Sequence, residues 1–244
     1  GAFAPYIRAY MRRSGAPDDI GILVALKDKA NAHKNPYAHL QLDLTYDDIK
    51  GSPMLWDPVR FHETCPSSDG ACAMVLANEA KAHTSAASPA WVLATANRSE
   101  PMAFPGRDTV LPRAGRDCSG ELYQKAGITD PLRQIDVAEI YVPFSWFEPM
   151  WLENLGFAPE NEGWKYVESG VTQLGGDLPV NPSGGVLSSN PVGASGTLRF
   201  AEAALQVRGQ AGEHQVDGVR IAMGHAYGGL SQYFAMWLLG AEKP

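Results

Sequence analysis

The residues of this chain whose types and spacing suit chemistry centre on Asn190. It lies in the segment 180–196, which reads Val-Asn-Pro-Ser-Gly-Gly-Val-Leu-Ser-Ser-Asn-Pro-Val-Gly-Ala-Ser-Gly. Two glycine clusters flank Asn190, and an apolar stretch follows at 197–207. Tight glycine turns let the backbone approach a ligand closely, and the N–H groups that open a helix favour an oxyanion or a phosphate. By physical chemistry alone, the segment predicts a glycine loop before a helix.

Tyrosine and histidine side chains outside that segment, among them Tyr141, His225 and Tyr227, could move a proton. A tyrosine has a reference pKa of about 10, which must be lowered or relayed for base catalysis at neutral pH. A histidine, with a reference pKa of about 6.5, is already close to the working range. The structural alternative is a tyrosine that packs in the core and a histidine that makes a hydrogen bond in a glycine turn. Residue type alone leaves both alternatives open.

Apolar periodicity and breaker residues predict that these side chains lie on alternating strands and helices. Tyr141 is expected to end a strand, and His225 and Tyr227 to follow one in a glycine-rich turn at 224–229. Strands that alternate with helices indicate an α/β fold in which helices pack against a sheet. In this second half the predicted helices are 120–126, 144–155 and 197–207, and the predicted strands are 91–96, 137–141, 218–223 and 232–239.

The first half is expected to be more helical, with helices at 3–14, 20–33 and 79–83. A further short helix at 45–50 begins at Thr45, with Asp48 in the capping-box position, and a turn-rich connection covers 53–61. The segment 69–76, Asp-Gly-Ala-Cys-Ala-Met-Val-Leu, is apolar on both faces and therefore predicts a buried central strand. Trp146, Phe147 and Trp151 are expected in the core or at a dimer contact.

Composition excludes several classes of function. A net charge of −7 over 244 residues gives no electrostatic footprint for nucleic acid. No apolar run approaches the roughly 18–20 residues needed to cross a bilayer. The cysteines lack zinc-ligand spacing and are too few for a disulfide framework, so we predict no metal site and a cytoplasmic location. There are three of them, Cys65, Cys72 and Cys118.

The order of residues at 180–196 resembles the Asn-x-x-Gly-Gly…Gly-His-Pro-x-Gly-Ala-Ser-Gly block of the thiolase superfamily, with Asn190 at the position of the histidine. Further segments resemble the branch that contains the thiolase part of sterol carrier protein X and related lipid-transfer enzymes. The resemblance covers nearly the whole chain and implies a thiolase-like α/β fold, with a mixed sheet and helices on both faces. The further segments are Tyr-Met-Arg-Arg at 10–13, Asn-Ala-His-Lys-Asn-Pro-Tyr-Ala at 31–38, Ser-Asp-Gly-Ala at 68–71 and Ile-Asp-Val-Ala-Glu-Ile-Tyr at 135–141.

The departures from the thiolase pattern decide which chemistry the resemblance implies. Asn190 replaces the histidine, and Tyr141 replaces the asparagine of the family's Asn-Glu-Ala-Phe motif. The run 224–229, Gly-His-Ala-Tyr-Gly-Gly, stands where the family carries its second catalytic cysteine, and nothing resembles the half that carries the nucleophilic cysteine. Acyl transfer needs a thiolate and a second acid or base. Acyl transfer is therefore disfavoured.

What remains is the capacity to hold a thioester enolate, for which Asn190 offers an amide N–H. Retro-aldol cleavage of a 3-hydroxyacyl-CoA makes such an enolate without acyl transfer, and the chain resembles cysteine-less members of the branch that cleave steroid side chains in this way. The resemblance implies no cofactor, because the substrate is itself a CoA thioester. By motif position, the expected catalytic residues are Tyr141, His225, Asn190 and Tyr227, and the expected substrate-binding residues are Gly193, Ser195 and Gly228.

Two alternatives stay open: a thiolase acyltransferase whose cysteine-bearing half is missing, and a non-catalytic acyl-CoA or lipid-binding subunit. The resemblance also implies a homodimer and a small OB-fold partner protein. By analogy with the family, residues 1–57 form a loop-domain region, residues 58–90 the end of the N-terminal thiolase half, and residues 91–244 a C-terminal thiolase-like domain.

Overall fold

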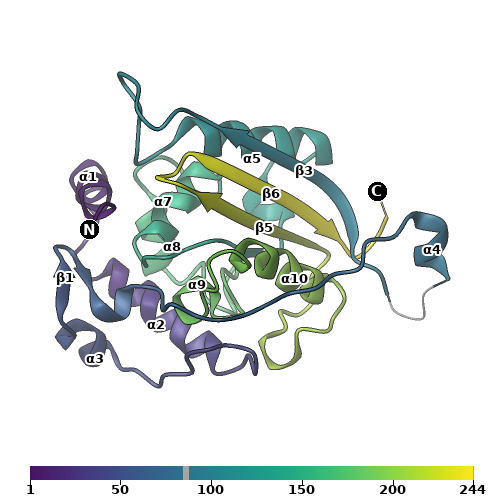
Figure 1. The fold of residues 1–244 in the computed structure, drawn as a ribbon, viewed down its shortest axis with the longest axis horizontal. Helices are drawn as coiled ribbons and strands as arrows, with labels where there is room; N and C mark the ends of the chain where they lie inside the picture. Colours follow the sequence, from purple (N-terminus) through teal and green to yellow (C-terminus); the bar gives the residue numbers. More distant parts are fainter. Residues whose placement is uncertain (85–87, 244) are drawn as a thin grey trace.

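A four-stranded sheet organises the molecule. The computed structural model describes residues 1–84 and 88–243. The strand order across the sheet is β3-β6-β5-β4 (Figure 1). Strand β6 runs antiparallel to both β3 and β5, whereas β4 runs parallel to β5, so the predicted mixed sheet is confirmed. The strands are β3 (Trp91–Ser99), β4 (Val137–Glu139), β5 (Ile221–Gly228) and β6 (Tyr233–Gly240).

Helices cover both faces of this sheet, as predicted. Helix α5 (Arg113–Ala126) packs against β3 and β6, and helix α10 (Ser195–Val207) packs against β5 and β4 on the other face (Figure 1). Successive side chains of a strand point to opposite faces. Ala222 accordingly packs in the cluster with Ala203 and Val207 of α10, whereas its neighbour Met223 belongs to the larger cluster on the opposite side.

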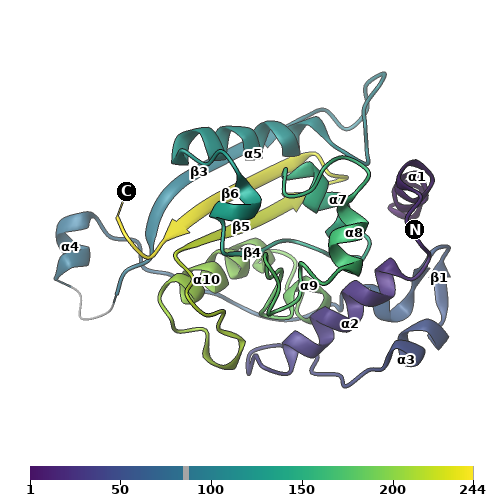
Figure 2. The same ribbon diagram turned by 180° about the vertical axis from the view of Figure 1, so that it is seen from behind.

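The first 63 residues form a helical layer beside the sheet. Helix α2 (Ile20–Ala32) lies against α3 (Tyr46–Gly51), α8 (Gly163–Glu168) and α9 (Gly185–Ser188), as the reverse view in Figure 2 shows. The capping box predicted at Thr45 and Asp48 is confirmed, because each side chain accepts the other residue's backbone N–H. The turn-rich connection 53–61 contains a small hairpin, which the sequence did not predict. The remaining elements are α1 (Ala4–Ser14), β1 (Met54–Trp56), β2 (Val59–Arg60), η1 (Phe61–Glu63), α4 (Glu79–His83), α6 (Pro131–Gln134), α7 (Phe147–Asn154) and η2 (Gly212–His214).

The buried central strand predicted at 69–76 is wrong. Within the described residues, 69–77 belong to no helix or strand, and their backbone N–H groups make no hydrogen bond. Val75 and Leu76 are 96% and 76% exposed. An apolar pattern makes a strand only where a neighbouring strand supplies hydrogen-bond partners, and the described residues place none beside this segment.

Several element boundaries also differ from the prediction. Strand β4 ends at Glu139, so Tyr141 lies two positions beyond the strand rather than at its end. Helix α5 begins at Arg113, seven residues before the predicted start at Gly120. Strand β5 runs to Gly228 rather than ending at Met223, so His225 and Tyr227 lie within a strand and not in a glycine turn. The ladder with β6 continues through Gly228, paired with Tyr233, and these hydrogen bonds outweigh the weak strand preference of the glycines.

The hydrophobic core joins distant parts of the chain. Trp146, Phe147 and Trp151 are fully buried, so they are core residues. One hydrophobic cluster contains both Ile7 and Leu238. The predicted ranges 1–57, 58–90 and 91–244 therefore share a common core, and their division into domains stays a prediction.

Candidate active site

Three of the predicted site residues meet at one carboxamide oxygen. The Tyr141 hydroxyl donates to Oδ1 of Asn190 over 3.0 Å, and the Ser195 hydroxyl donates to the same oxygen over 2.8 Å. Ser195 is the first residue of α10. Tyr141 lies two positions after Glu139, the last residue of β4. The start of the helix and the end of the parallel strand thus bring together residues that lie about fifty positions apart in sequence.

Tyr141 is held by its backbone as well as by its hydroxyl. Its N–H donates to Nδ1 of His225 over 3.3 Å, and its carbonyl oxygen accepts from Nε1 of Trp151 over 2.9 Å. Burial is the largest influence on the Tyr141 hydroxyl and raises its pKa above the usual value. Hydrogen bonding with Ser195 and Asn190 and the positive charge of Arg199 act in the opposite direction. At neutral pH most of Tyr141 is therefore in the neutral phenol form, and only its ionised fraction can accept a proton.

His225 contacts the backbone of Tyr141 and not its hydroxyl. It is fully buried in β5, and because Nδ1 accepts the Tyr141 N–H, the proton of the neutral ring lies on Nε2. Among the described residues Nε2 has no hydrogen-bond partner. Burial lowers the pKa of His225 to about 3. This geometry suits a residue that holds Tyr141, and the catalytic role expected for His225 stays a prediction.

The aromatic ring of Tyr227 packs against Tyr141 and forms one side of the site. Its ring meets the Tyr141 ring edge-on, with centroids 5.3 Å apart, and stacks on Phe147 at 5.7 Å. Burial, followed by the nearby Tyr141 and Cys65, raises the pKa of Tyr227 well above its usual value. Tyr227 therefore remains a protonated phenol in contact with Tyr141.

The sequence prediction missed two residues, Cys65 and Ser68, that contact Asn190. The side-chain N–H of Asn190 donates to Sγ of Cys65 over 3.2 Å, and the backbone N–H donates to the Ser68 hydroxyl oxygen over 3.0 Å. Ser68 also contacts Nδ1 of His39 at 2.8 Å. The resemblance of 68–71 to a family motif was the available signal, but it gave no reason to join that segment to Asn190.

Cys65 is a thiol rather than a thiolate in this position. Burial raises its pKa, although the Asn190 hydrogen bond and the nearby Lys29 charge lower it in part. Lys29 is buried on α2, where its ammonium donates to the Leu187 carbonyl oxygen, and burial lowers its pKa to about 8. A nucleophilic cysteine needs a depressed pKa, so Cys65 does not supply the thiolate that acyl transfer requires.

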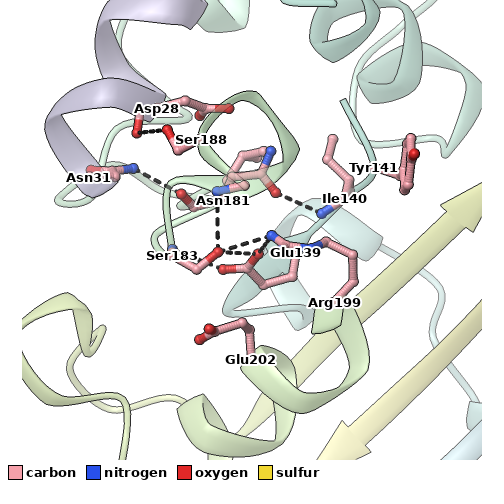
Figure 3. Close-up of polar contacts among 12 residues, drawn as sticks. Asp28, Asn31, Glu139, Ile140, Tyr141, Asn181, Ser183, Ser188, Arg199 and Glu202 are labelled. Carbon is pink, nitrogen blue, oxygen red and sulfur yellow. Dashed lines mark hydrogen bonds and ion pairs between the residues drawn. The ribbon is translucent and has the colours of Figure 1, made fainter. Parts of the chain in front are cut away.

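A buried polar network supports the Tyr141 turn from below, as Figure 3 shows. Oδ1 of Asn181 accepts the Ile140 N–H over 2.8 Å, and the Asn181 carbonyl oxygen accepts from Asn31 of α2 over 3.1 Å. Asn181 adopts a left-handed backbone (φ 52°), which asparagine tolerates better than most residues. Nearby Gly184 lies so close to α2 that an added Cβ would be 2.6 Å from that of Ala32. Gly184 therefore lets this loop lie directly on α2.

The other two predicted binding residues lie apart from the Asn190 oxygen. Gly193 is exposed, in the turn between Asn190 and Ser195. Gly228 ends β5 and lines a cavity of about 340 Å³ together with Tyr227, Tyr233 and other residues of β3 and β6. Of the site described above, only Tyr227 lies among the described residues that line this cavity.

The chain belongs to the family described as Thiolase C-terminal domain-like, whose model matches residues 96–241, more than half of its length. It is 34% identical to an acetyl-CoA acetyltransferase from Methanothermobacter thermautotrophicus, over 93% of this chain and 59% of that protein. It is 32% identical to sterol carrier protein 2 from Bos taurus, over 91% of this chain and 42% of that protein.

Solved structures with this fold include a protein complex described as an Ltp2–ChsH2(DUF35) aldolase. The match has a TM-score of 0.87 and 27% identity, and it covers 97% of this chain and 62% of that one. A monomeric SCP2-thiolase-like protein from Mycobacterium smegmatis matches with a TM-score of 0.65 and 17% identity, over 99% of this chain and 52% of that one, and this likeness concerns the fold alone. The matches show that the chain has the thiolase fold. The chain spans three fifths or less of the length of the relatives named here.

Two features are absent from the described residues. No helix among them is both long and apolar enough to cross a membrane. In the same residues, no group of three or more His, Cys, Asp or Glu side chains is arranged to hold a metal ion.

Proposed function

We propose that this chain carries the active-site residues of an acyl-CoA lyase, which cleaves a 3-hydroxyacyl-CoA by a retro-aldol reaction into a ketone and a shorter acyl-CoA. The observation that carries the proposal is the Tyr141 hydroxyl bonded to the Asn190 carboxamide, beside a cysteine kept as a thiol. The likeness to the Ltp2–ChsH2(DUF35) aldolase supports it. By resemblance to steroid side-chain lyases, we propose a steroid side chain as the acyl group.

In the proposed reaction the fraction of Tyr141 that is ionised accepts the proton of the C3 hydroxyl. The C2–C3 bond breaks, C3 becomes the ketone carbonyl, and the bonding electrons form the thioester enolate. Tyr141 then returns the proton to C2, which releases the shorter acyl-CoA and restores the phenolate. The atoms balance without a redox partner, so we propose that no cofactor is needed beyond the CoA of the substrate.

Asn190 and its neighbours supply the electrostatic part of this mechanism. The side-chain amide of Asn190 has two hydrogens, of which one points at Cys65. The second can donate to the enolate oxygen, and such a donor typically contributes about 3 kcal/mol to the transition state. In this proposal Ser195 fixes the amide, Gly193 and Gly228 border the acyl group, and Tyr227 excludes water from Tyr141.

The test compares Tyr141→Phe with Tyr123→Phe, a variant that loses a half-buried tyrosine hydroxyl bonded to the Leu155 carbonyl oxygen. We expect Tyr141→Phe to lower kcat by about 10²–10⁴-fold on a branched 3-hydroxyacyl-CoA, because proton transfer is lost. Tyr123→Phe is expected to keep its turnover. Ketone and acyl-CoA release are measured, and circular dichroism reports folding. Full turnover in folded Tyr141→Phe would show that Tyr141 is not the base.

The same assay separates the two alternatives. Products without added free CoA establish the lyase, whereas turnover of a 3-ketoacyl-CoA that requires CoA establishes a thiolase, as the acetyltransferase relative suggests. Binding of the substrate without turnover in either assay would favour an acyl-CoA-binding subunit.

We further propose a cytoplasmic homodimer that works with a small OB-fold partner protein. The structural neighbour consists of two named components, which supports a partner subunit. The assay is therefore run with and without such a protein, and light scattering after size-exclusion chromatography measures the oligomeric state.

A further inference from the structure

A buried ion pair lies beneath the Tyr141 site and takes no part in the reaction proposed above. The guanidinium of Arg199 contacts the carboxylate of Glu139, and the two residues are 3% and 0% exposed. Ser183 fixes both partners: its hydroxyl donates to Oε2 of Glu139 over 2.8 Å and accepts from Nη1 of Arg199 over 2.9 Å (Figure 3). The Ser183 N–H adds a third bond, to Oε1 of Glu139, over 3.0 Å.

The pair joins the two elements that build the site. Glu139 is the last residue of β4 and precedes Tyr141 by two positions. Arg199 lies four residues after Ser195 on α10, and residues spaced by four share one face of a helix. The guanidinium thus lies one helical turn from the hydroxyl that shares the Asn190 oxygen with Tyr141.

A purely structural ion pair is the alternative explanation, and two features argue against it. A buried ion pair is usually a poor stabiliser compared with apolar side chains of similar volume, because both charges must be desolvated. In addition, Nε of Arg199 is buried without a hydrogen-bond partner among the described residues. One N–H of the guanidinium is therefore left without an acceptor among these residues, and the Arg199 charge acts on the nearby Tyr141 hydroxyl.

We propose that Arg199 is a positioning residue for Tyr141: held by Glu139 and Ser183, its fixed positive charge stabilises the ionised hydroxyl of Tyr141. The inference rests on the proposed function in so far as Tyr141 is the base of that reaction. Stabilising the phenolate raises the fraction of protein that can accept the substrate proton at neutral pH.

Among the described residues, the other titratable groups that face Tyr141 carry no positive charge near neutral pH. From β5, His225 has a pKa lowered to about 3 by burial, and Tyr227 has a pKa raised well above 10. Cys65, from the segment after η1, has a raised pKa and is uncharged. From α7, the indole of Trp151 is not titratable. Arg199 is thus the cation that lowers the pKa of Tyr141 against the effects of burial and Cys65.

The test measures the ionisation of Tyr141 directly. The chain is labelled with 3-fluorotyrosine, whose ring fluorine lowers the phenol pKa and reports ionisation by ¹⁹F NMR. Of nine tyrosine signals, the one missing in Tyr141→Phe belongs to Tyr141. We expect Arg199→Met to raise the midpoint of that signal by about one pH unit, since an opposite charge nearby typically shifts a pKa by that much or more. Arg199→Lys, which keeps the charge, is expected to shift it less.

Two further variants make the test decisive. Glu139→Gln leaves the Arg199 charge unneutralised and is expected to lower the midpoint, and it decides the question if Arg199→Met does not fold. Arg107→Met removes a similarly buried arginine, which pairs with Glu100 on another part of the chain, and is expected to leave the midpoint unchanged. An unchanged midpoint in Arg199→Met, or an equal shift in Arg107→Met, overturns the proposal.

The pH dependence of kcat/KM separates this inference from the proposed function. If the lyase is active, its activity rises with pH through the Tyr141 midpoint, and Arg199→Met moves that rise to higher pH. Shifted NMR midpoints without turnover in any variant would refute the lyase and keep the coupling of Arg199 to Tyr141. Tyr141-dependent turnover with unshifted midpoints would refute the coupling alone.

Discussion

At the scale of single residues, the site depends on which hydrogen-bond partner each group has. Asn190 accepts two hydroxyls on one oxygen and donates to Cys65, so the orientation of its amide follows from its neighbours. His225 accepts the Tyr141 N–H with Nδ1 and must stay neutral to do so. The protonation state of a residue behind the site therefore controls where Tyr141 lies.

This dependence predicts an acid-sensitive stability. The pKa of His225 is about 3 when folded and about 6.5 in an unfolded chain. Because the unfolded state binds the proton first, the stability present above pH 6.5 is lost as pH falls toward 3, by about 1.4 kcal/mol per pH unit. His225→Gln keeps an acceptor for the Tyr141 N–H and cannot titrate, so we expect its stability to fall less.

Urea unfolding of both proteins at pH 7.5, 5.5 and 4.5 measures the effect. The free-energy difference between the parent and His225→Gln should shrink as the pH falls. His39→Gln, at an exposed histidine, serves as the control. Parallel curves for parent and His225→Gln would contradict the prediction.

At the scale of elements, helix α5 shows that one residue type has opposite effects at different positions. Gly115 is buried where α5 meets α7, and an added Cβ would lie 1.9 Å from Oδ1 of Asn154. Asn154 cannot easily move, because its side chain donates to the Pro112 carbonyl oxygen over 3.0 Å. Gly120 on the same helix is exposed, and an added Cβ would meet nothing within 4 Å.

Alanine substitutions at these two positions should therefore have opposite signs. We expect Gly115→Ala to lower the free energy of unfolding by about 1–3 kcal/mol through overpacking. Gly120→Ala is expected to raise it by about 0.5–1 kcal/mol, because alanine is the better helix former. Thermal and urea unfolding of the two variants measure both changes. Equal effects at the two sites would show that α5 does not pack on α7 in this way.

At the scale of the whole molecule, the apolar segment 69–76 is exposed, although the sequence predicts that it is buried. Its extended backbone has free N–H groups among the described residues, and Val75 and Leu76 point into solvent. Unpaired extended segments of this kind act as templates for pairing with another chain. The surface is therefore one at which copies of the free chain should associate.

We expect the double variant Val75→Lys, Leu76→Lys to reduce concentration-dependent association of the free chain, because added charge blocks strand pairing. Sedimentation velocity over a range of protein concentrations measures the change. Met102→Lys, at another exposed side chain (53%) in the loop between β3 and α5, is the matched control. If association persists unchanged in the double variant, the segment is not where the copies meet.

Much of the secondary structure could be predicted from local sequence. The pattern of α10, the capping box at Thr45 and the strands β3 and β6 follow from periodicity and cap chemistry, which act over a few neighbouring residues. The block around Asn190 and the residue Tyr141 could be singled out by motif order. Their meeting at one oxygen is visible only in the folded chain, since 49 residues separate them.

Tertiary structure alone decided which residues far apart in the sequence contact one another. It placed His225 in a strand and behind Tyr141, because β6 supplied a ladder that local preference does not encode. It brought Cys65 to Asn190 and Arg199 to Glu139, and it left 69–76 exposed among the described residues. Sequence determines which groups are available and which local elements form, whereas burial, and with it each group's charge state, depends on packing between segments remote in sequence.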